Sequence, residues 1–227
     1  DNKLRDCTDK PGEVLYILEG DSAESVFRNC RNTRTEANLP LRGKILNVEK
    51  QSLAKIGENK EIKNIIEAMG QYPYRYNKVK IVADADFDGL HINVLVTLIF
   101  MKYFPELIKE GRLSIVLPPL YGAKKGKEFI PIYRAKDIEK YKGYDIQRFK
   151  GLGEMTGPQM RTMLDKHHEY VIKMPKTTKI IEDLLKIITD AETKRSYLEK
   201  LEYNFTDFIS NIIEESYENT TSSETSK

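Results

Sequence analysis

Short apolar runs and helix-like apolar patterns alternate along the chain, with polar segments between them. Residues 14–18 form a first strand-like run, which ends at Glu19. Asp21 followed by Glu24 matches a capping box, so we predict that the chain turns there from a strand into a helix. Four apolar residues after this point share one helix face: Ala23, Val26, Phe27 and Cys30.

A second unit of the same kind lies in the middle of the chain. Residues 59–69 predict a helix that ends at Gly70, residues 79–83 a strand, and residues 91–104 a helix that Pro105 interrupts. The face of the 59–69 helix consists of Ile62, Ile65, Ile66 and Met69. Two strand-loop-helix units predict an α/β fold in which helices flank a parallel sheet.

Further strand-like segments follow. The sequence KKGK between two of them predicts a hairpin turn, residues 180–188 an amphipathic helix, and the last dozen residues a disordered polar tail. The predicted strands are residues 113–117, 129–133, 145–149 and 170–174. Those after residue 118 would form an additional strand and helix part after the parallel sheet.

The loop after the 79–83 strand, DADFDG, places Asp84, Asp86 and Asp88 at alternate positions. Ligands bind beyond the carboxyl ends of parallel strands, so we expect Glu19 and these aspartates at one sheet edge. Crowded carboxylates raise one another's pKa and need a compensating cation. Oxygen ligands favour Mg²⁺, with Mn²⁺ or Ca²⁺ also suited to them, and Mg²⁺ commonly adds phosphate oxygens to one or two carboxylates.

Two simpler interpretations of the aspartates compete with this one. DADFDG matches the start of an EF-hand calcium loop, but Leu95 stands where that loop needs a bidentate Glu. The aspartates could also only cap the helix that follows, yet one Asp is enough for a cap. We therefore favour a divalent metal bound together with phosphate.

Composition narrows the class of protein only a little. The 227 residues are 40% hydrophobic, and 37 Lys and Arg against 35 Asp and Glu give a net charge of +2, so any nucleic-acid surface must be local. There is no signal-peptide core and no apolar stretch that could span a membrane, so we expect a cytoplasmic protein with no membrane partner. The first residue is not Met, from which we expect a piece of a longer chain.

Five sequence blocks in a fixed order resemble the TOPRIM portion of type IIA DNA topoisomerases, in particular the B subunits of bacterial gyrase and topoisomerase IV. The blocks are ILEGDSA (17–23), LPLRGKILNVEK (39–50), DADFDG (84–89), PPLY (118–121) and RFKGLGEM (148–155). The resemblance departs from the family at Glu24-Ser25-Val26, where most bacterial members continue with a Gly-rich segment. The chain also lacks the large insertion that some gyrases carry after PPLY.

The resemblance implies a Rossmann-like TOPRIM fold that binds Mg²⁺ and cleaves duplex DNA beside a tyrosine on a partner A-type subunit, in an A2B2 heterotetramer. Glu19, Asp84 and Asp86 match the metal-binding acids, and Asp88 matches the third aspartate of the motif. We count Glu19, Asp84, Asp86 and Lys44 as catalytic candidates. ATP would bind only in a region outside this chain, and the chain alone would be inactive.

Basic residues in the same blocks are candidates for DNA contact. Arg42 and Lys44 in PLRGK, and Arg148 and Lys150 in RFKGLG, combine cations with glycines. His91 follows the acidic loop and is a further candidate. A TOPRIM nuclease or primase, and a Ca²⁺-binding module without enzymatic activity, remain as alternatives.

These observations predict a domain order. Residues 1–12 would link to a preceding region, and residues 13–118 would form the TOPRIM metal-binding core. Residues 119–175 would form the strand-rich part with the RFKGLGEM block, 176–215 the C-terminal helices, and 216–227 the tail.

Overall fold

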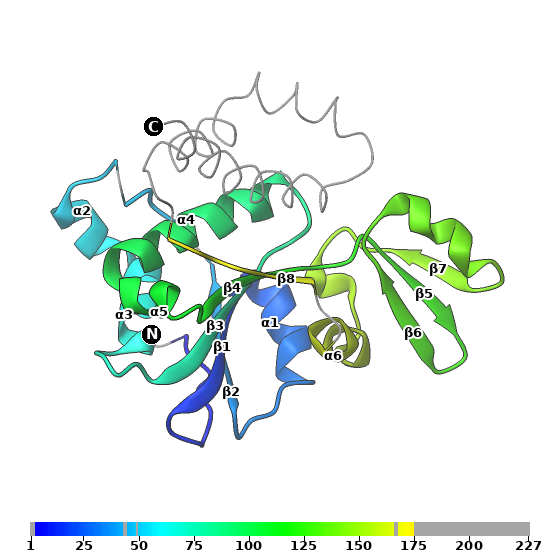
Figure 1. Ribbon diagram of the computed structural model, residues 1–227, viewed down its shortest axis with the longest axis horizontal. Coiled ribbons are helices and arrows are strands. Elements are labelled where there is room, and N and C mark those ends of the chain that lie inside the picture. Colours follow the sequence, from blue (N-terminus) through cyan, green and yellow to red (C-terminus); the bar gives the residue numbers. More distant parts are fainter. Residues whose placement is uncertain (1–2, 43–44, 49, 166–167, 175–227) are drawn as a thin grey trace, which may run out of the picture.

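The computed structural model of the chain describes residues 3–42, 45–48, 50–165 and 168–174. It contains two sheets, a five-stranded one with the order β2-β1-β3-β4-β8 and a three-stranded one with the order β6-β5-β7. The five-stranded sheet lies in the middle of the molecule with helices on both sides, and the three-stranded sheet extends from one end (Figure 1). The predicted α/β class is confirmed.

Four parallel strands form most of the five-stranded sheet: β1 (Gly12–Glu19), β2 (Glu36–Leu41), β3 (Tyr76–Val82) and β4 (Leu113–Leu117). The fifth strand, β8 (His168–Val171), pairs with β4 in the antiparallel direction. The prediction of a strand at 170–174 was therefore right in kind, but the strand begins earlier. Strand β2 was not predicted, although all six of its residues are buried.

Alternate side chains of β1 point to opposite faces of the sheet, as the two-residue period of a strand requires. Leu15 and Ile17 belong to the core cluster under α3 (Lys60–Met69), α4 (Phe87–Tyr103) and α5 (Pro105–Lys109). Tyr16 and Leu18 belong to the opposite cluster, under α1 (Gly20–Arg28) and α6 (Gly157–Asp165). The short α2 (Leu53–Glu58) lies beside α3. This packing on two faces fixes the carboxyl edge of the sheet.

The three-stranded sheet is antiparallel and consists of β5 (Tyr121–Lys125), β6 (Glu128–Ile132) and β7 (Asp145–Arg148). The predicted KKGK turn is confirmed, and Gly126 takes the positive φ of 60° that the turn requires. The strand before the turn is β5, which was not predicted, whereas the predicted partner at 113–117 is β4 of the five-stranded sheet. The 3-10 helix η1 (Ala135–Tyr141) joins β6 to β7 and contacts β5 and β6. A second 3-10 turn, η2 (Leu152–Glu154), follows β7 and leads to α6.

Three local predictions need correction. Asp21 does not cap α1, because Gly20 at a φ of 76° turns the strand directly into the helix and leaves Asp21 inside the first turn. Helix α4 begins at Phe87 rather than at residue 91, because Asp86 serves as its N-cap. Ile66 on α3 is 38% exposed, whereas the other three residues of its predicted face are buried.

The structure describes most of the N-terminal segment but not the C-terminal one. Residues 3–11, expected to be a linker, pack against the sheet: Arg5 pairs with Asn38 of β2, and Cys7 is buried. The helix predicted at 180–188 and the polar tail lie outside the described residues. Within the part of the chain that the structure describes, none of the helices has the length and apolar character that a bilayer-crossing segment requires.

Candidate metal centre and nucleic-acid interface

Glu19 and Asp84 meet at the carboxyl edge of the five-stranded sheet. Strands β1 and β3 are parallel neighbours and pair at Leu18 and Val82, so the residues that follow them come out side by side. The backbone N–H of Asp84 donates a hydrogen bond to Oε2 of Glu19 at 2.8 Å. The sequence prediction that strand ends bring these acids together is thus correct for this pair.

Burial, together with the nearby charges of Asp84, Asp86 and Asp88, raises the pKa of Glu19 to about 7, although the hydrogen bond from the Asp84 N–H lowers it. Glu19 therefore interacts electrostatically with all three aspartates of the loop. A carboxyl group with this pKa exchanges a proton near neutral pH.

Asp84 is held from the other side by the turn that follows β7. The backbone N–H of Leu152 donates to Oδ1 of Asp84 at 2.8 Å. A Cβ atom on Gly151 would lie 2.8 Å from Oδ2 of the same carboxylate, so only glycine lets the turn come this close. Burial raises the pKa of Asp84, as do the charges of Asp86 and Glu154, while the Leu152 N–H lowers it.

Asp86 caps helix α4, because its Oδ1 accepts the backbone N–H of Gly89 at 2.8 Å. Gly89 itself cannot be replaced without rebuilding the loop, since a Cβ atom there would lie 2.0 Å from the backbone oxygen of Asp84. Asp86 and Asp88 are exposed, and Asp88 lies in the first turn of α4. The loop therefore points carboxylates both into the edge and toward solvent.

The donor set fits a hard divalent cation. Glu19, Asp84 and Asp86 each have one oxygen fixed by a backbone N–H, while the second oxygen accepts no hydrogen bond from any described residue. No three His, Cys, Asp or Glu side chains of the described residues converge closely enough to enclose a metal on their own. Such an open edge suits Mg²⁺, which needs only one or two carboxylates when phosphate and water complete its shell.

The basic candidates are distributed around this edge. Arg42 follows β2 and forms an exposed ion pair with Asp21. Arg148 ends β7 and is exposed, as is Lys150, whose backbone N–H donates to Glu154 at 2.9 Å. His91 lies in α4 and is partly buried. Lys44 lies outside the described residues, so its place at the site stays a prediction.

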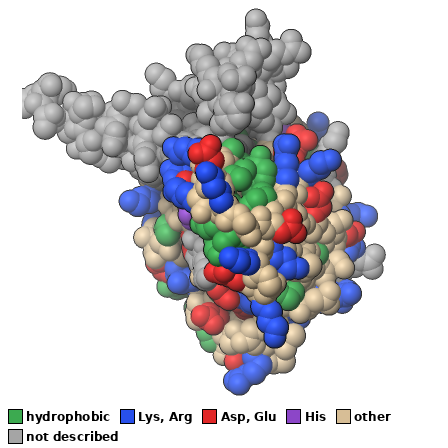
Figure 2. Space-filling model, turned by 90° about the vertical axis from the view of Figure 1, so that its right-hand side faces the viewer, with side chains coloured by type: hydrophobic (Ala, Val, Ile, Leu, Met, Phe, Trp, Pro, Cys, Tyr) green, Lys and Arg blue, Asp and Glu red, His purple; other side chains and the backbone are tan. Residues whose placement is uncertain are grey.

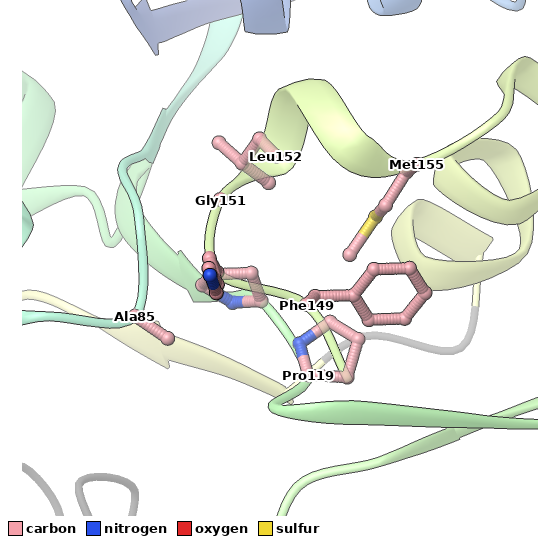
Figure 3. Close-up of a pocket in the computed structure, with 8 residues that line it drawn as sticks. Ala85, Pro119, Phe149, Gly151, Leu152 and Met155 are labelled. Carbon is pink, nitrogen blue, oxygen red and sulfur yellow. The ribbon is translucent and has the colours of Figure 1, made fainter. Parts of the chain in front are cut away.

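A small pocket connects three of the sequence blocks. It is lined by Ala85 of the acidic loop, Pro118 and Pro119 of the PPLY block, and five residues of the RFKGLGEM block: Phe149, Lys150, Gly151, Leu152 and Met155. In Figure 3, Gly151 and Leu152 lie on the turn above Ala85, while Phe149 and Met155 point toward each other. Segments more than 60 residues apart in sequence, such as those of Asp84 and Leu152, thus form one surface.

Glu154 was missed by the sequence analysis. Its carboxylate holds the Lys150 N–H and adds negative charge near Asp84. Its position inside the RFKGLGEM block was the available signal, but the hydrogen bond across the turn could not be inferred from the block alone.

Comparisons with known proteins agree with this geometry. The Toprim domain family matches residues 14–117. The DNA gyrase B subunit of Spiroplasma citri is 41% identical over an alignment of 191 residues, and the match covers 76% of this chain and 30% of that protein. The DNA gyrase B subunit of Thermotoga maritima is 36% identical over an alignment of 218 residues, and the match covers 87% of this chain and 34% of that protein.

A solved structure is similar over most of the chain. The Plasmodium falciparum topoisomerase II DNA-binding, cleavage and re-ligation domain matches with a TM-score of 0.68 and 25% identity, covering 87% of this chain and 31% of that one. The chain belongs to the type IIA topoisomerase B-subunit family and corresponds to its Toprim part. It spans 30% to 34% of the length of the gyrase relatives described above.

Proposed function

We propose that the protein to which this chain belongs changes DNA topology by reversible, Mg²⁺-dependent cleavage of both strands of duplex DNA. The observation that carries this proposal is the edge of the five-stranded sheet, where Glu19, Asp84 and Asp86 are each oriented by a backbone N–H. Asp88 contributes charge from the same loop. This chain would supply the acidic half of the cleavage site.

The nucleophile in this proposal is a tyrosine of an A-type partner, in an A2B2 assembly. ATP would bind and be hydrolysed in a region of the protein outside this chain. We also place the protein in the cytoplasm, on DNA. These features come from the family, whose members include the DNA gyrase B proteins of Spiroplasma citri and Thermotoga maritima.

Each acid has its own task in this scheme. Bound Mg²⁺ would relieve negative charge at the scissile phosphate and at the leaving 3′ oxygen. Mn²⁺ or Ca²⁺ would fit the same oxygen donors. Asp84 and Asp86 would hold the cation through their second oxygens, while Glu19, with a pKa of about 7, would also pass a proton to or from the 3′ oxygen.

The basic candidates would hold the DNA at the edge. Arg148 and Lys150 immediately precede the turn that fixes Asp84, so their exposed charges lie on the segment that leads to the acids. Arg42 follows β2 and His91 lies in the first turns of α4, and we keep Lys44 in the same role. Contacts of this kind to phosphates position the duplex without reading its sequence.

The test is a reconstitution. The full-length protein is combined with its A-type partner, and Mg²⁺-dependent cleavage of duplex DNA is measured for the natural protein and for Asp84→Ala with Asp86→Ala. We expect the double variant to lose at least about 10²-fold in cleavage, the loss that follows when a major charge-stabilising group is removed. A control with Glu58→Ala and Glu67→Ala, which removes two exposed acids on α2 and α3, should cleave normally.

Two outcomes would contradict the proposal. Full cleavage by the Asp84 and Asp86 variant would show that these acids do not hold the metal. Nicking by this protein without any partner would instead favour the TOPRIM nuclease alternative, because our scheme takes the nucleophile from another chain.

A further inference from the structure

Positive charge is concentrated in the three-stranded sheet and η1. Residues 121–148 contain eight Lys and Arg but four Asp and Glu, a net charge of +4 in a chain whose total is +2. The rest of the chain is therefore slightly acidic, at −2. The small net charge of the whole chain therefore does not reveal this uneven distribution of charge.

Four lysines of this unit, which we call the basic rim, are exposed: Lys124, Lys127, Lys136 and Lys142. None of the four makes an ion pair or a side-chain hydrogen bond with another described residue. Their neighbours differ, since Arg134 and Lys140 both pair with Asp137, and Lys125 lies over the ring of Tyr144 at 5.3 Å. The rim therefore keeps its charge available to a partner.

The basic rim is continuous with the acidic edge. Strand β7 runs from Asp145, paired with Lys124 at the hairpin end, to Arg148, paired with Tyr121. The chain then passes through Lys150 and Gly151 to Leu152, which holds Asp84. At about 3.3 Å per residue, the hairpin end lies about 10 Å beyond Arg148, or roughly three base pairs of DNA.

The chemistry of the surface favours a nucleic acid over a protein as its partner. Protein interfaces are centred on aromatic or apolar anchors. The exposed large hydrophobic residues of the described chain all lie elsewhere: Leu53, Ile66, Tyr72, Val171 and Met174. Figure 2, viewed from the end with the small sheet, shows Lys and Arg side chains spread over several parts of that end, with acidic and hydrophobic side chains between them. Cations distributed in this way suit a line of phosphates rather than a single small anion.

We propose that the basic rim binds the phosphate backbone of the duplex DNA that flanks the cleavage site. This inference rests on the proposed function for the identity of the substrate, and adds to it a second contact surface outside the acidic edge. The contact is independent of base sequence, because it consists of exposed lysines and phosphates. It increases affinity for long duplexes and leaves the cleavage step itself unchanged.

The experiment measures DNA binding without cleavage. The full-length protein, assembled with its A-type partner, is titrated without divalent metal onto two fluorescent duplexes, a short one that spans only the cleavage site and one extended by about 10 base pairs at each end. The test variant replaces the four rim lysines by Gln. A matched control replaces four exposed lysines at the opposite end of the molecule by Gln: Lys55, Lys60, Lys63 and Lys78.

We expect the rim variant to bind the long duplex about 10-fold more weakly, with a log–log salt slope shallower by about 3 to 4, near 0.9 for each lost phosphate contact. Binding to the short duplex should stay within about twofold of the natural protein, and replacing the four lysines by Arg should preserve binding to both duplexes. The control should behave like the natural protein.

Three results would overturn the inference. The rim variant could bind the long duplex as the control does, or it could lose affinity equally for both duplexes, which would make the rim part of the cleavage site. It could also fail to associate with the A-type partner while its DNA binding is intact, which would identify a protein surface. The binding assay needs no cleavage, so it tests the basic rim alone. A failure of the proposed cleavage activity would appear only in the cleavage assay.

Discussion

At the edge of the five-stranded sheet, Glu19 and Asp84 are partly buried, and backbone N–H groups fix one oxygen of each. In the three-stranded sheet, Lys124 and Lys127 are exposed, and no described residue binds their side chains. The two sheets thus hold charge in opposite ways. The acids are oriented by hydrogen bonds and repel one another, whereas the lysines are exposed to solvent.

The difference corresponds to two kinds of chemistry. A metal that supports phosphoryl transfer must be placed accurately, which requires ligands oriented by their surroundings. Attraction to the DNA backbone depends on the number of charges and on salt more than on geometry. We therefore expect substitutions at the acidic edge to change the rate of cleavage and those at the basic sheet to change affinity.

The largest effect should come from a substitution that adds one carbon beside Asp84. In Gly151→Ala the new Cβ would lie 2.8 Å from Oδ2 of Asp84, so the carboxylate or the turn must move. A displacement near 1 Å at a catalytic group costs about 10²-fold in rate, which we expect in the Mg²⁺-dependent cleavage assay. Gly57→Ala is the control, because nothing lies within 4 Å of its added Cβ. Equal cleavage by both variants would mean that the turn does not position Asp84.

A smaller effect is expected from the two cations that lie between the sheets. Replacing Arg148 and Lys150 by Gln should weaken DNA binding by about 10-fold and make the log–log salt slope shallower by about 2. Cleavage at saturating DNA should be unchanged, because neither side chain orients an acid. Binding curves at several salt concentrations measure this, with Lys55→Gln and Lys63→Gln as the matched pair. A lower cleavage rate with unchanged affinity would contradict the division of roles.

The acidic edge should also give the metal-free protein a distinct pH dependence. The pKa of Glu19 is about 7 in the folded protein, above its ordinary value of 4.5, so the folded state binds more protons between these values. The contribution of Glu19 to stability is therefore present at low pH and is lost as the pH rises through 7. With a chelator present, we expect this group to lower the Tm by about 2 to 4 °C between about pH 5 and pH 7.5.

Thermal unfolding of Glu19→Gln provides the comparison, since Gln cannot ionise. The natural protein should lose more Tm over this pH range than the variant does. Parallel curves for the two proteins would show that the edge does not raise the pKa of Glu19.

The smallest effect should come from Asp21→Asn, which breaks the exposed ion pair with Arg42. Pairs of this kind contribute about 0.5 kcal/mol or less, so denaturant unfolding should barely change. A loss above about 2 kcal/mol would place this pair in the same class as the buried contacts of the acidic edge.

The sequence could predict the meeting of Glu19 with the aspartate loop, because parallel strands bring their carboxyl ends to one edge. It could not predict that Leu152 holds Asp84, because a backbone N–H has no signature in the sequence and its partner is 68 residues away. The antiparallel direction of β8 was missed for a similar reason: the side-chain pattern of a strand carries no information on its direction. The capping box at Asp21 failed because the conformation of Gly20 decides where the helix begins.

The charge of the three-stranded sheet shows the limit of whole-chain composition. A total of +2 gave no reason to expect a basic surface, yet residues 121–148 alone carry +4. Which of these cations are already paired became visible only in the fold, where Asp137 binds Arg134 and Lys140 and leaves the four rim lysines unpaired among the described residues.

The most direct test of the central claim is a measurement of metal binding by the full-length protein with and without charge at Asp84 and Asp86. Asn at both positions keeps an oxygen that can accept the N–H groups of Leu152 and Gly89, so the local structure should persist. Titration with Mn²⁺, followed by electron paramagnetic resonance and competed with Mg²⁺, should show a site in the natural protein that the double Asn variant loses. Equal Mn²⁺ binding by the two proteins would contradict the assignment of these carboxylates as the metal centre.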